Sequence, residues 1–170
     1  MTTGDNTLNT TQRLLAGATL LLAAGSGFAA SGLSITREAT LDAAPATAWK
    51  LIGNFQGLDV WHPALAGSQG TGNAAGSTRV LSLVGGGTIN EKLTAYSATK
   101  RSLTYVIVKS PLPVKNYVST MTVSPTGDGK SLVKWTSTFD ANGADDAKAK
   151  EVIGGIYDAG LSKATAILKR

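Results

Sequence analysis

Two residues of opposite charge occupy strand-like segments in which every second side chain is apolar. Arg79 alternates with Leu81 and Leu83, and Glu91 lies two positions from Ile89 on one side and from an apolar residue on the other. Side chains at positions i and i+2 of a strand point to the same face, so both charges are predicted to face the interior. A desolvated carboxylate is a candidate general acid or base, and an arginine can stabilise developing negative charge.

Two interpretations account for these inward charges. In the first, Arg79 and Glu91 form a structural ion pair across neighbouring strands, because an isolated buried charge costs several kcal/mol. In the second, they lie in a mostly apolar pocket between a sheet and a helix, where a few polar groups orient a ligand. In such a pocket the pKa of Glu91 is raised unless Arg79 holds the carboxylate ionised. Strand parity alone does not choose between them.

Hydroxyl and indole groups are predicted to share this interior face. Tyr105 lies two positions from Ile107, Tyr117 lies two positions from Ser119, and each pair falls in a strand-like segment. We therefore predict Glu91 and Arg79 as the candidate catalytic residues. The predicted ligand-binding residues are Arg79, Leu81, Leu83, Glu91, Tyr105, Ile107, Tyr117, Ser119, Trp135, Ile156, Trp61 and His62.

The single histidine and the lack of cysteine narrow the possible chemistry. His62 lies between Trp61 and Pro63, where a pocket rim is expected, and it is interpreted either as a rim residue without chemistry or as a ligand contact. There is no second imidazole for a proton relay or a histidine-rich metal site. The absence of cysteine excludes disulfides, thiol nucleophiles, iron–sulfur clusters and most structural zinc sites. We expect no metal and no cofactor.

The segments that carry these residues are predicted to be strands, followed by one long helix. The strands are expected at residues 33–41, 79–84, 89–96, 103–108, 117–123 and 132–139, with a weaker one within 66–73. A helix over residues 44–55 and a short helix or turn over 57–65 follow the first strand. An apolar stripe from residue 145 onward predicts an amphipathic C-terminal helix. This order indicates an α+β fold, with a mostly antiparallel sheet curved around the last helix.

Residues 1–29 resemble a secretory signal peptide. A polar stretch ends in Arg13, an apolar segment covers residues 14–24, and small residues surround Ala29. The apolar segment is short for a hydrocarbon core that needs about twenty residues. We expect cleavage after Ala29, a periplasmic or secreted location, and one mature domain over residues 30–170. An uncleaved N-terminal membrane anchor is the alternative.

The 170-residue chain carries 16 basic and 11 acidic side chains, a formal charge of +5. The basic residues are scattered and are not interleaved with aromatic ones, so they are interpreted as a solvated surface with a mild preference for anions. We expect no nucleic-acid partner. We also expect no stable membrane span after signal cleavage.

The order of these elements and several short motifs resemble the START-like helix-grip superfamily (SRPBCC), in its polyketide cyclase/dehydratase and lipid-transport branch. The motifs are Trp61-His62-Pro63, Gly76-Ser77-Thr78-Arg79, Asn90-Glu91-Lys92-Leu93 and Lys115-Asn116-Tyr117. The resemblance covers the mature chain. It implies a seven-stranded antiparallel sheet wrapped around a long C-terminal helix, two short helices after the first strand, and a hydrophobic ligand cavity between sheet and helix.

Two groups of relatives imply roles for particular residues. Plant lachrymatory-factor synthase uses an arginine and a glutamate in its cavity, and the similar positions here are Arg79 and Glu91. Plant abscisic-acid receptors have similar pocket positions at Glu91, Tyr105, Tyr117 and Ser119. The gate segment of those receptors is replaced by residues 84–88, and a cavity glutamate by Trp135. The resemblance therefore supports neither the receptors' ligand nor their gated partner.

Three functions are consistent with the sequence. The favoured one is an exported protein that binds a small hydrophobic or amphipathic molecule, or a lipid. The alternative is a cofactor-independent cyclase, dehydratase or isomerase, in which Glu91 acts as acid or base, Arg79 stabilises an anion, and Tyr105 or Tyr117 orients the substrate. A third is an accessory interaction module for another exported protein.

Overall fold

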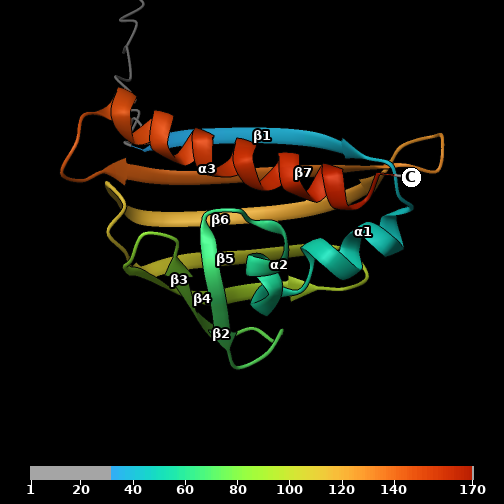
Figure 1. The fold of residues 1–170 in the computed structure, drawn as a ribbon, viewed down its shortest axis with the longest axis horizontal. Coiled ribbons are helices and arrows are strands. Elements are labelled where there is room, and N and C mark those ends of the chain that lie inside the picture. The colour runs from blue at the N-terminus through green and yellow to red at the C-terminus, as the bar shows by residue number, and fades with distance from the viewer. Residues whose placement is uncertain (1–31, 170) are drawn as a thin grey trace, which may run out of the picture.

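Seven strands and a long C-terminal helix make up most of the described chain (Figure 1). The computed structural model describes residues 32–169, so the predicted signal peptide lies outside the described residues. The elements are β1 (Leu33–Leu41), α1 (Pro45–Ile52), the 3-10 helix η1 (Phe55–Gly57), α2 (Leu58–Trp61), β2 (Leu65–Gly70), β3 (Thr78–Leu83), β4 (Thr88–Ser97), β5 (Ser102–Lys109), β6 (Val114–Pro125), β7 (Ser131–Ala141) and α3 (Asp146–Ile167).

The strands form one antiparallel sheet in the order β1-β7-β6-β5-β4-β3-β2. Strands β2 to β7 are joined by consecutive hairpins, and β1 pairs with β7, so that Leu33 lies opposite Phe139. Helix α3 contacts β1 and β7, whereas α2 contacts β2 and α3 (Figure 1). Helix α1 contacts β6 and β7, so the helices together lie over one face of the sheet. This confirms the predicted helix-grip fold.

The covered face carries the core, and its side chains follow the predicted period of two. In β6, Tyr117, Ser119, Met121 and Val123 are buried, whereas the residues between them are more exposed. Arg79 and Glu91 are also buried, with 3% and 5% of their surfaces exposed. The inward orientation predicted from strand parity is confirmed for both charges.

The predicted helix over residues 44–55 is shorter in the structure. Helix α1 begins at Pro45, which suits a first helical turn, and ends at Ile52, where the Gly53 N–H donates to the Trp49 carbonyl. The chain then turns through η1 and α2, which together bring Phe55 and Trp61 into the core. Trp49 on α1 and Phe55 on η1 are therefore both buried, although they belong to two separate helical segments.

Two strands differ from the sequence prediction. The weakly predicted strand within 66–73 is β2, an edge strand that starts at Leu65 and ends at Gly70. Strand β6 begins at Val114, three residues earlier than predicted, because Val114 and Lys115 also pair with β7. The pairing register shifts between Lys115 and Val118. Asn116 has a positive φ of 53° at this irregularity, a conformation that asparagine tolerates better than most residues.

A run of three glycines closes the hairpin between β3 and β4. Gly85, Gly86 and Gly87 have φ values of 91°, 101° and 90°, a region that glycine adopts without steric cost. The Gly86 N–H donates to the Leu83 carbonyl, and the Leu83 N–H donates to the Gly87 carbonyl. These two bonds close a tight turn between the two strands.

Helix α3 packs closely against α2 and the sheet at Gly160. A Cβ atom on Gly160 would lie 2.7 Å from His62 Cδ2, 3.1 Å from Trp135 Cζ3 and 3.2 Å from Trp61 Cζ3. By contrast, a Cβ on Gly155 would have no neighbour within 4 Å. Close packing therefore explains why a glycine occupies position 160, but it does not explain the glycine at position 155.

We predict opposite effects of alanine at these two positions. Gly160→Ala is expected to lower the free energy of unfolding by about 1–3 kcal/mol, because three rings must move to admit the methyl group. Gly155→Ala is the matched control and is expected to raise it by roughly 0.5–1 kcal/mol through helix propensity. Urea unfolding followed by circular dichroism measures both. Equal effects of the two substitutions would contradict the close packing at Gly160.

Candidate functional site

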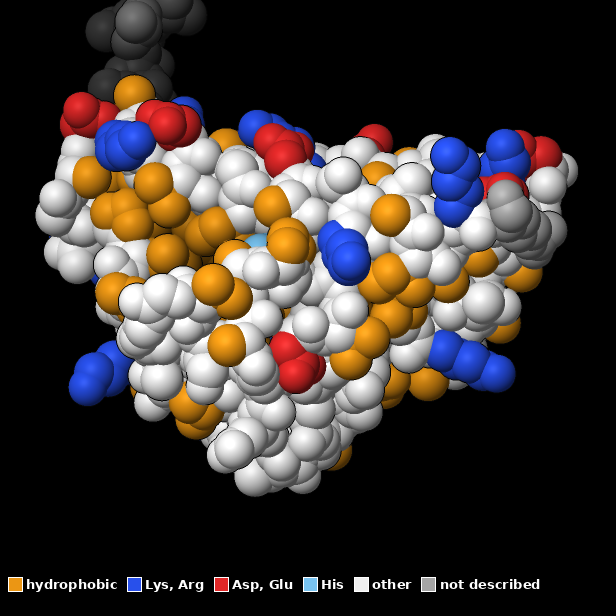
Figure 2. All heavy atoms as spheres, viewed as in Figure 1, with side chains coloured by type: hydrophobic (Ala, Val, Ile, Leu, Met, Phe, Trp, Pro, Cys, Tyr) orange, Lys and Arg blue, Asp and Glu red, His pale blue; other side chains and the backbone are white. Residues whose placement is uncertain are grey.

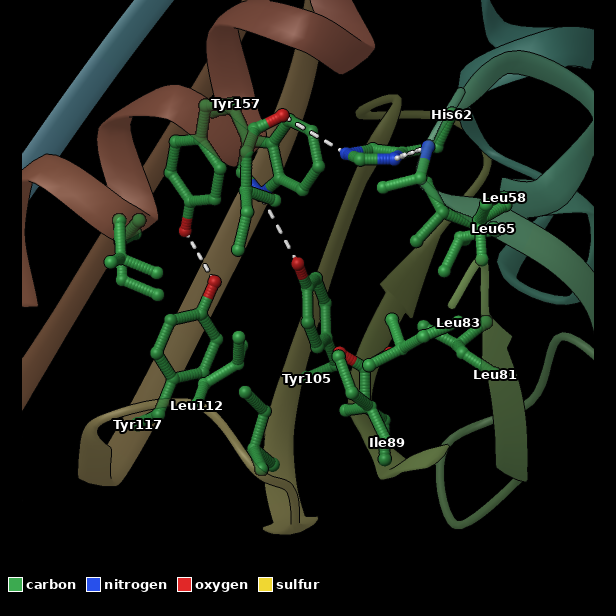
Figure 3. Close-up of a pocket in the computed structure, with 18 residues that line it drawn as sticks. Leu58, His62, Leu65, Leu81, Leu83, Ile89, Tyr105, Leu112, Tyr117 and Tyr157 are labelled. Carbon is green, nitrogen blue, oxygen red and sulfur yellow. Dashed lines mark hydrogen bonds between the residues drawn. The ribbon is translucent and has the colours of Figure 1, made fainter. Parts of the chain in front are cut away.

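A pocket of about 340 Å³ lies between the concave face of the sheet, α2 and α3. Most of its wall is aliphatic or aromatic, with contributions from β2 to β7 and from the N-terminal half of α3 (Figure 3). Figure 2 shows hydrophobic side chains gathered around a hollow beside α3, with the histidine ring visible among them. Nine of the residues predicted from sequence line this pocket: Leu81, Leu83, Glu91, Tyr105, Ile107, Tyr117, Trp135, Ile156 and His62.

Three predicted residues are buried behind the wall rather than in it. Arg79 is not among the lining residues, because its guanidinium group lies beneath Phe55 and Tyr105. Trp61 packs edge-on against Trp135, with ring centroids 5.6 Å apart. Ser119 is also buried, and its hydroxyl group bonds to Trp135 and Tyr157. These residues support the pocket without facing its space.

The sequence analysis missed several lining residues, and Tyr157 is the most informative of them. The others are Leu58, Ala64, Leu65, Val84, Ile89, Leu112, Val152 and Ile153. Tyr157 lies in the apolar stripe of the last helix, where an aromatic residue is usually core. Its hydroxyl group in an otherwise aliphatic stripe is the signal that could have identified it.

Arg79 and Glu91 form an ion pair across β3 and β4. They are directly opposite in the register, and Arg79 Nε donates to Glu91 Oε2 at 2.5 Å. Arg79 Nη1 donates to the Phe55 carbonyl, which ties η1 to the sheet. The guanidinium carbon lies 4.1 Å from the Phe55 ring centroid and 5.1 Å from that of Tyr105. The two interpretations of the inward charges are therefore compatible, because Arg79 and Glu91 form an ion pair and Glu91 also lines a pocket.

Glu91 presents one unused carboxylate oxygen. Its Oε2 atom is bonded to Arg79, and within residues 32–169 its Oε1 atom receives no hydrogen bond. Burial raises the pKa of Glu91 above its ordinary value, and the charge and hydrogen bond of Arg79 oppose that rise. The pocket therefore contains an acceptor that can also exchange a proton.

A network of hydrogen-bonded hydroxyl and indole groups joins β5, β6, β7 and α3 beside the pocket. The single Trp135 Nε1–H is shared between the Tyr105 hydroxyl at 3.1 Å and Ser119 Oγ at 3.0 Å. Ser119 Oγ also lies 3.1 Å from the Tyr157 hydroxyl, which is bonded to the Tyr117 hydroxyl (Figure 3). Burial raises the pKa of all three tyrosines, so they remain protonated and neutral.

His62 links α2 to α3 and has no free ring nitrogen. Its Nε2–H donates to the Ile156 carbonyl at 2.9 Å, and its Nδ1 accepts from the Ala64 N–H at 3.3 Å. This pair of bonds requires the neutral Nε2–H tautomer. Burial lowers the pKa of His62, so the ring stays neutral near pH 7. His62 therefore contributes an edge of the pocket and a link between helices.

Two further properties concern the described part of the chain. Among residues 32–169, no three acidic or histidine side chains lie close enough together to hold a metal ion. In the same range, every helix is too short or too polar to cross a membrane.

The comparisons with known proteins agree with this architecture. A family model described as polyketide cyclase / dehydrase and lipid transport matches residues 32–169. The protein XoxI from Bacillus cereus has 32% sequence identity and a TM-score of 0.75, over 79% of this chain and 94% of that chain. An uncharacterized protein from Bacillus thuringiensis has 31% identity and a TM-score of 0.76, over 81% and 100% of the two chains.

A third structure, from Thermobifida fusca, has 27% identity and a TM-score of 0.68, over 81% of this chain and 95% of that one. No match to a functionally curated protein was found. The comparisons thus show the family and the fold of the chain.

We predict that His62 makes stability depend on pH below neutrality. Because its pKa is lower in the folded protein than the ordinary histidine value of 6.5, the unfolded state binds more protons just below that pH. The free energy of unfolding should therefore fall as the pH drops through about 6.5, with a slope of at most ~1.4 kcal/mol per pH unit from this residue. His62→Gln, which removes the only histidine, should flatten this slope. Urea unfolding at a series of pH values measures it, and parallel slopes would refute the assignment.

Proposed function

Because the chain belongs to the polyketide cyclase / dehydrase and lipid transport family, we propose that it binds a small hydrophobic or amphipathic molecule between the sheet and α3. The pocket of about 340 Å³ carries the proposal, because protein interiors contain few voids larger than a water molecule. Its size lies in the range of ligand sites, about 300–1,000 Å³. Its wall combines apolar side chains with a few convergent polar groups, which is typical of such sites.

The pocket volume sets the size of a ligand. At ~30 Å³ per non-hydrogen atom, the share of one water molecule in the liquid, about 340 Å³ holds about eleven such atoms. A whole two-chain phospholipid would exceed this space, whereas a single aliphatic chain or a small ring system fits it. Exposed apolar residues at the margin, such as Val84, could contact any part of a ligand that projects outward.

An enzymatic function is the second candidate, and the free oxygen of Glu91 favours it. A carboxyl group with a raised pKa inside an apolar pocket can accept and return a proton, which is the step that cyclisation, dehydration and isomerisation share. The geometry does not support Arg79 as a group that touches the substrate, since its guanidinium lies beneath two aromatic rings. In this alternative Arg79 positions Glu91, and Tyr105 is the hydroxyl that orients the substrate.

Export is part of the proposal and rests on the sequence alone. Residues 1–29 have the order of a secretory signal, and they lie outside the described residues. On this proposal the mature protein begins at Ala30 and acts in the periplasm or outside the cell. A protein that keeps Met1 and stays in the cytoplasmic fraction would contradict it.

We predict that protein purified from its own host carries a bound small molecule that native mass spectrometry detects. Leu83→Trp should reduce the occupied fraction severalfold, because the added ring takes up part of the pocket. Ser82→Trp is the matched control, since the neighbouring side chain is exposed on the other face of β3. An empty wild-type protein that also shows no thermal shift with a library of lipids and aromatic compounds would count decisively against ligand binding.

We predict that Glu91→Gln separates binding from catalysis. The substitution keeps the shape of the side chain and much of its hydrogen bonding but removes the proton acceptor. If the protein is an enzyme, turnover of its substrate should fall by about 10²–10⁴-fold, while substrate binding persists. Circular dichroism checks that the variant is folded. Unchanged turnover by a folded variant would eliminate Glu91 as the acid or base.

A further inference from the structure

In the network of Trp135, Ser119 and the three tyrosines, each hydrogen bond can be assigned a donor and an acceptor, because the residues at its two ends have only one possible role. The Trp135 indole N–H can only donate, and the Thr136 carbonyl can only accept. Ser119 Oγ donates its one hydrogen to the Thr136 carbonyl at 2.8 Å and accepts from Trp135. Its remaining lone pair must therefore accept from the Tyr157 hydroxyl, which lies 3.1 Å away.

This order determines the other two tyrosines. Because the Tyr157 hydrogen points to Ser119, the bond between the hydroxyls of Tyr117 and Tyr157 must use the Tyr117 hydrogen. Tyr105 accepts from Trp135, and the Ser119 hydroxyl lies beside it. Ser119 Oγ is already occupied by the bonds described above, so no free acceptor for the Tyr105 hydrogen is found within residues 32–169. Tyr105 is therefore the tyrosine of this network whose hydrogen remains available to a ligand.

The unused acceptor lies on the neighbouring strand. Glu91 is paired with Ile107 and Tyr105 with Leu93, so Glu91 and Tyr105 are diagonal neighbours on the concave face of β4 and β5. Both line the pocket, and the Oε1 atom of Glu91 has no protein donor in the described range. The pocket thus offers a ligand one hydrogen-bond donor and one acceptor that carries negative charge.

The positive charge of Arg79 is turned away from the same space. Its Nε and Nη1 atoms bond to Glu91 and to the Phe55 carbonyl, and its guanidinium carbon lies against the rings of Phe55 and Tyr105. Its Nη2 atom is buried and has no partner among the described residues, so it does not reach the pocket surface. The pair is neutral as a whole, but its carboxylate end borders the pocket. Among the lining residues there is no lysine or arginine, and both nitrogens of His62 are occupied.

We propose that this pocket selects an uncharged amphiphile with a hydroxyl group and rejects a carboxylate of the same length. The inference rests on the proposed ligand-binding function and specifies the chemistry of the ligand. A hydroxyl group can accept from Tyr105 or donate to Glu91. A carboxylate cannot donate, loses its hydration in an apolar space, and meets the carboxylate end of the ion pair. No lysine or arginine among the lining residues is there to bind it.

Isothermal titration calorimetry with 1-decanol and sodium decanoate tests this. The chain length matches the pocket volume, and at about pH 7.5 the acid is ionised. We expect decanol to bind at least about tenfold more tightly, the usual consequence of leaving a charged group unpaired. Decanoate binding as tight as decanol overturns the inference and leaves the proposed function intact. Failure of both to bind overturns the inference and counts against the proposed function itself.

Two substitutions and a control locate the selectivity. Glu91→Gln removes the charge that faces the ligand and should reduce or reverse the preference for decanol. Tyr105→Phe should weaken decanol binding about five- to tenfold by removing the available donor. Tyr96→Phe is the control, because Tyr96 packs on Trp49 and does not line the pocket. A preference that persists in both folded pocket variants, or that changes equally in the control, overturns the assignment.

Discussion

The buried ion pair between Arg79 and Glu91 is the interaction on which the site depends. Removing either partner would leave an uncompensated charge at 3–5% exposure, a loss of about 3–5 kcal/mol in comparable cases. Arg79 also holds the Phe55 carbonyl, so the same guanidinium joins β3, β4 and η1. The aromatic rings that shield it from the pocket leave the carboxylate as the polar end of the ion pair that borders the space. The same ion pair thus joins three elements of the fold and supplies the polar group at the edge of the pocket.

The fold and the facing of its polar groups could be predicted because both follow from local periodicity. Strand alternation placed Arg79, Glu91, Tyr105 and Tyr117 on the interior face, and burial agrees for each of them. The apolar stripe of the last helix and its acidic start predicted α3, whose N-cap is Asp145. These features need only the residue's own neighbours in the sequence, since the period of an element fixes which side chains share a face.

The remaining features depend on contacts between distant segments. Periodicity shows that Arg79 points inward but not that its guanidinium turns toward the Phe55 carbonyl, 24 residues away. The partner of His62 is a helix carbonyl 94 residues further along, and the close approach depends on Gly160. Periodicity places Tyr157 in the apolar stripe of α3, but its hydroxyl finds its partners on the sheet only after α3 has packed. Tertiary packing decides each of these, which is why sequence pattern could not.

The central claim is that the space between sheet and α3 is a ligand site whose polar groups are incompletely satisfied by the protein. A high-resolution crystal structure of the protein purified from its own host tests it most directly. The account predicts continuous density too large for water in this pocket, with a polar atom within hydrogen-bond distance of the Tyr105 hydroxyl or of Glu91 Oε1. A pocket closed by its own side chains, or one holding only ordered water on Glu91 and Tyr105, would contradict it.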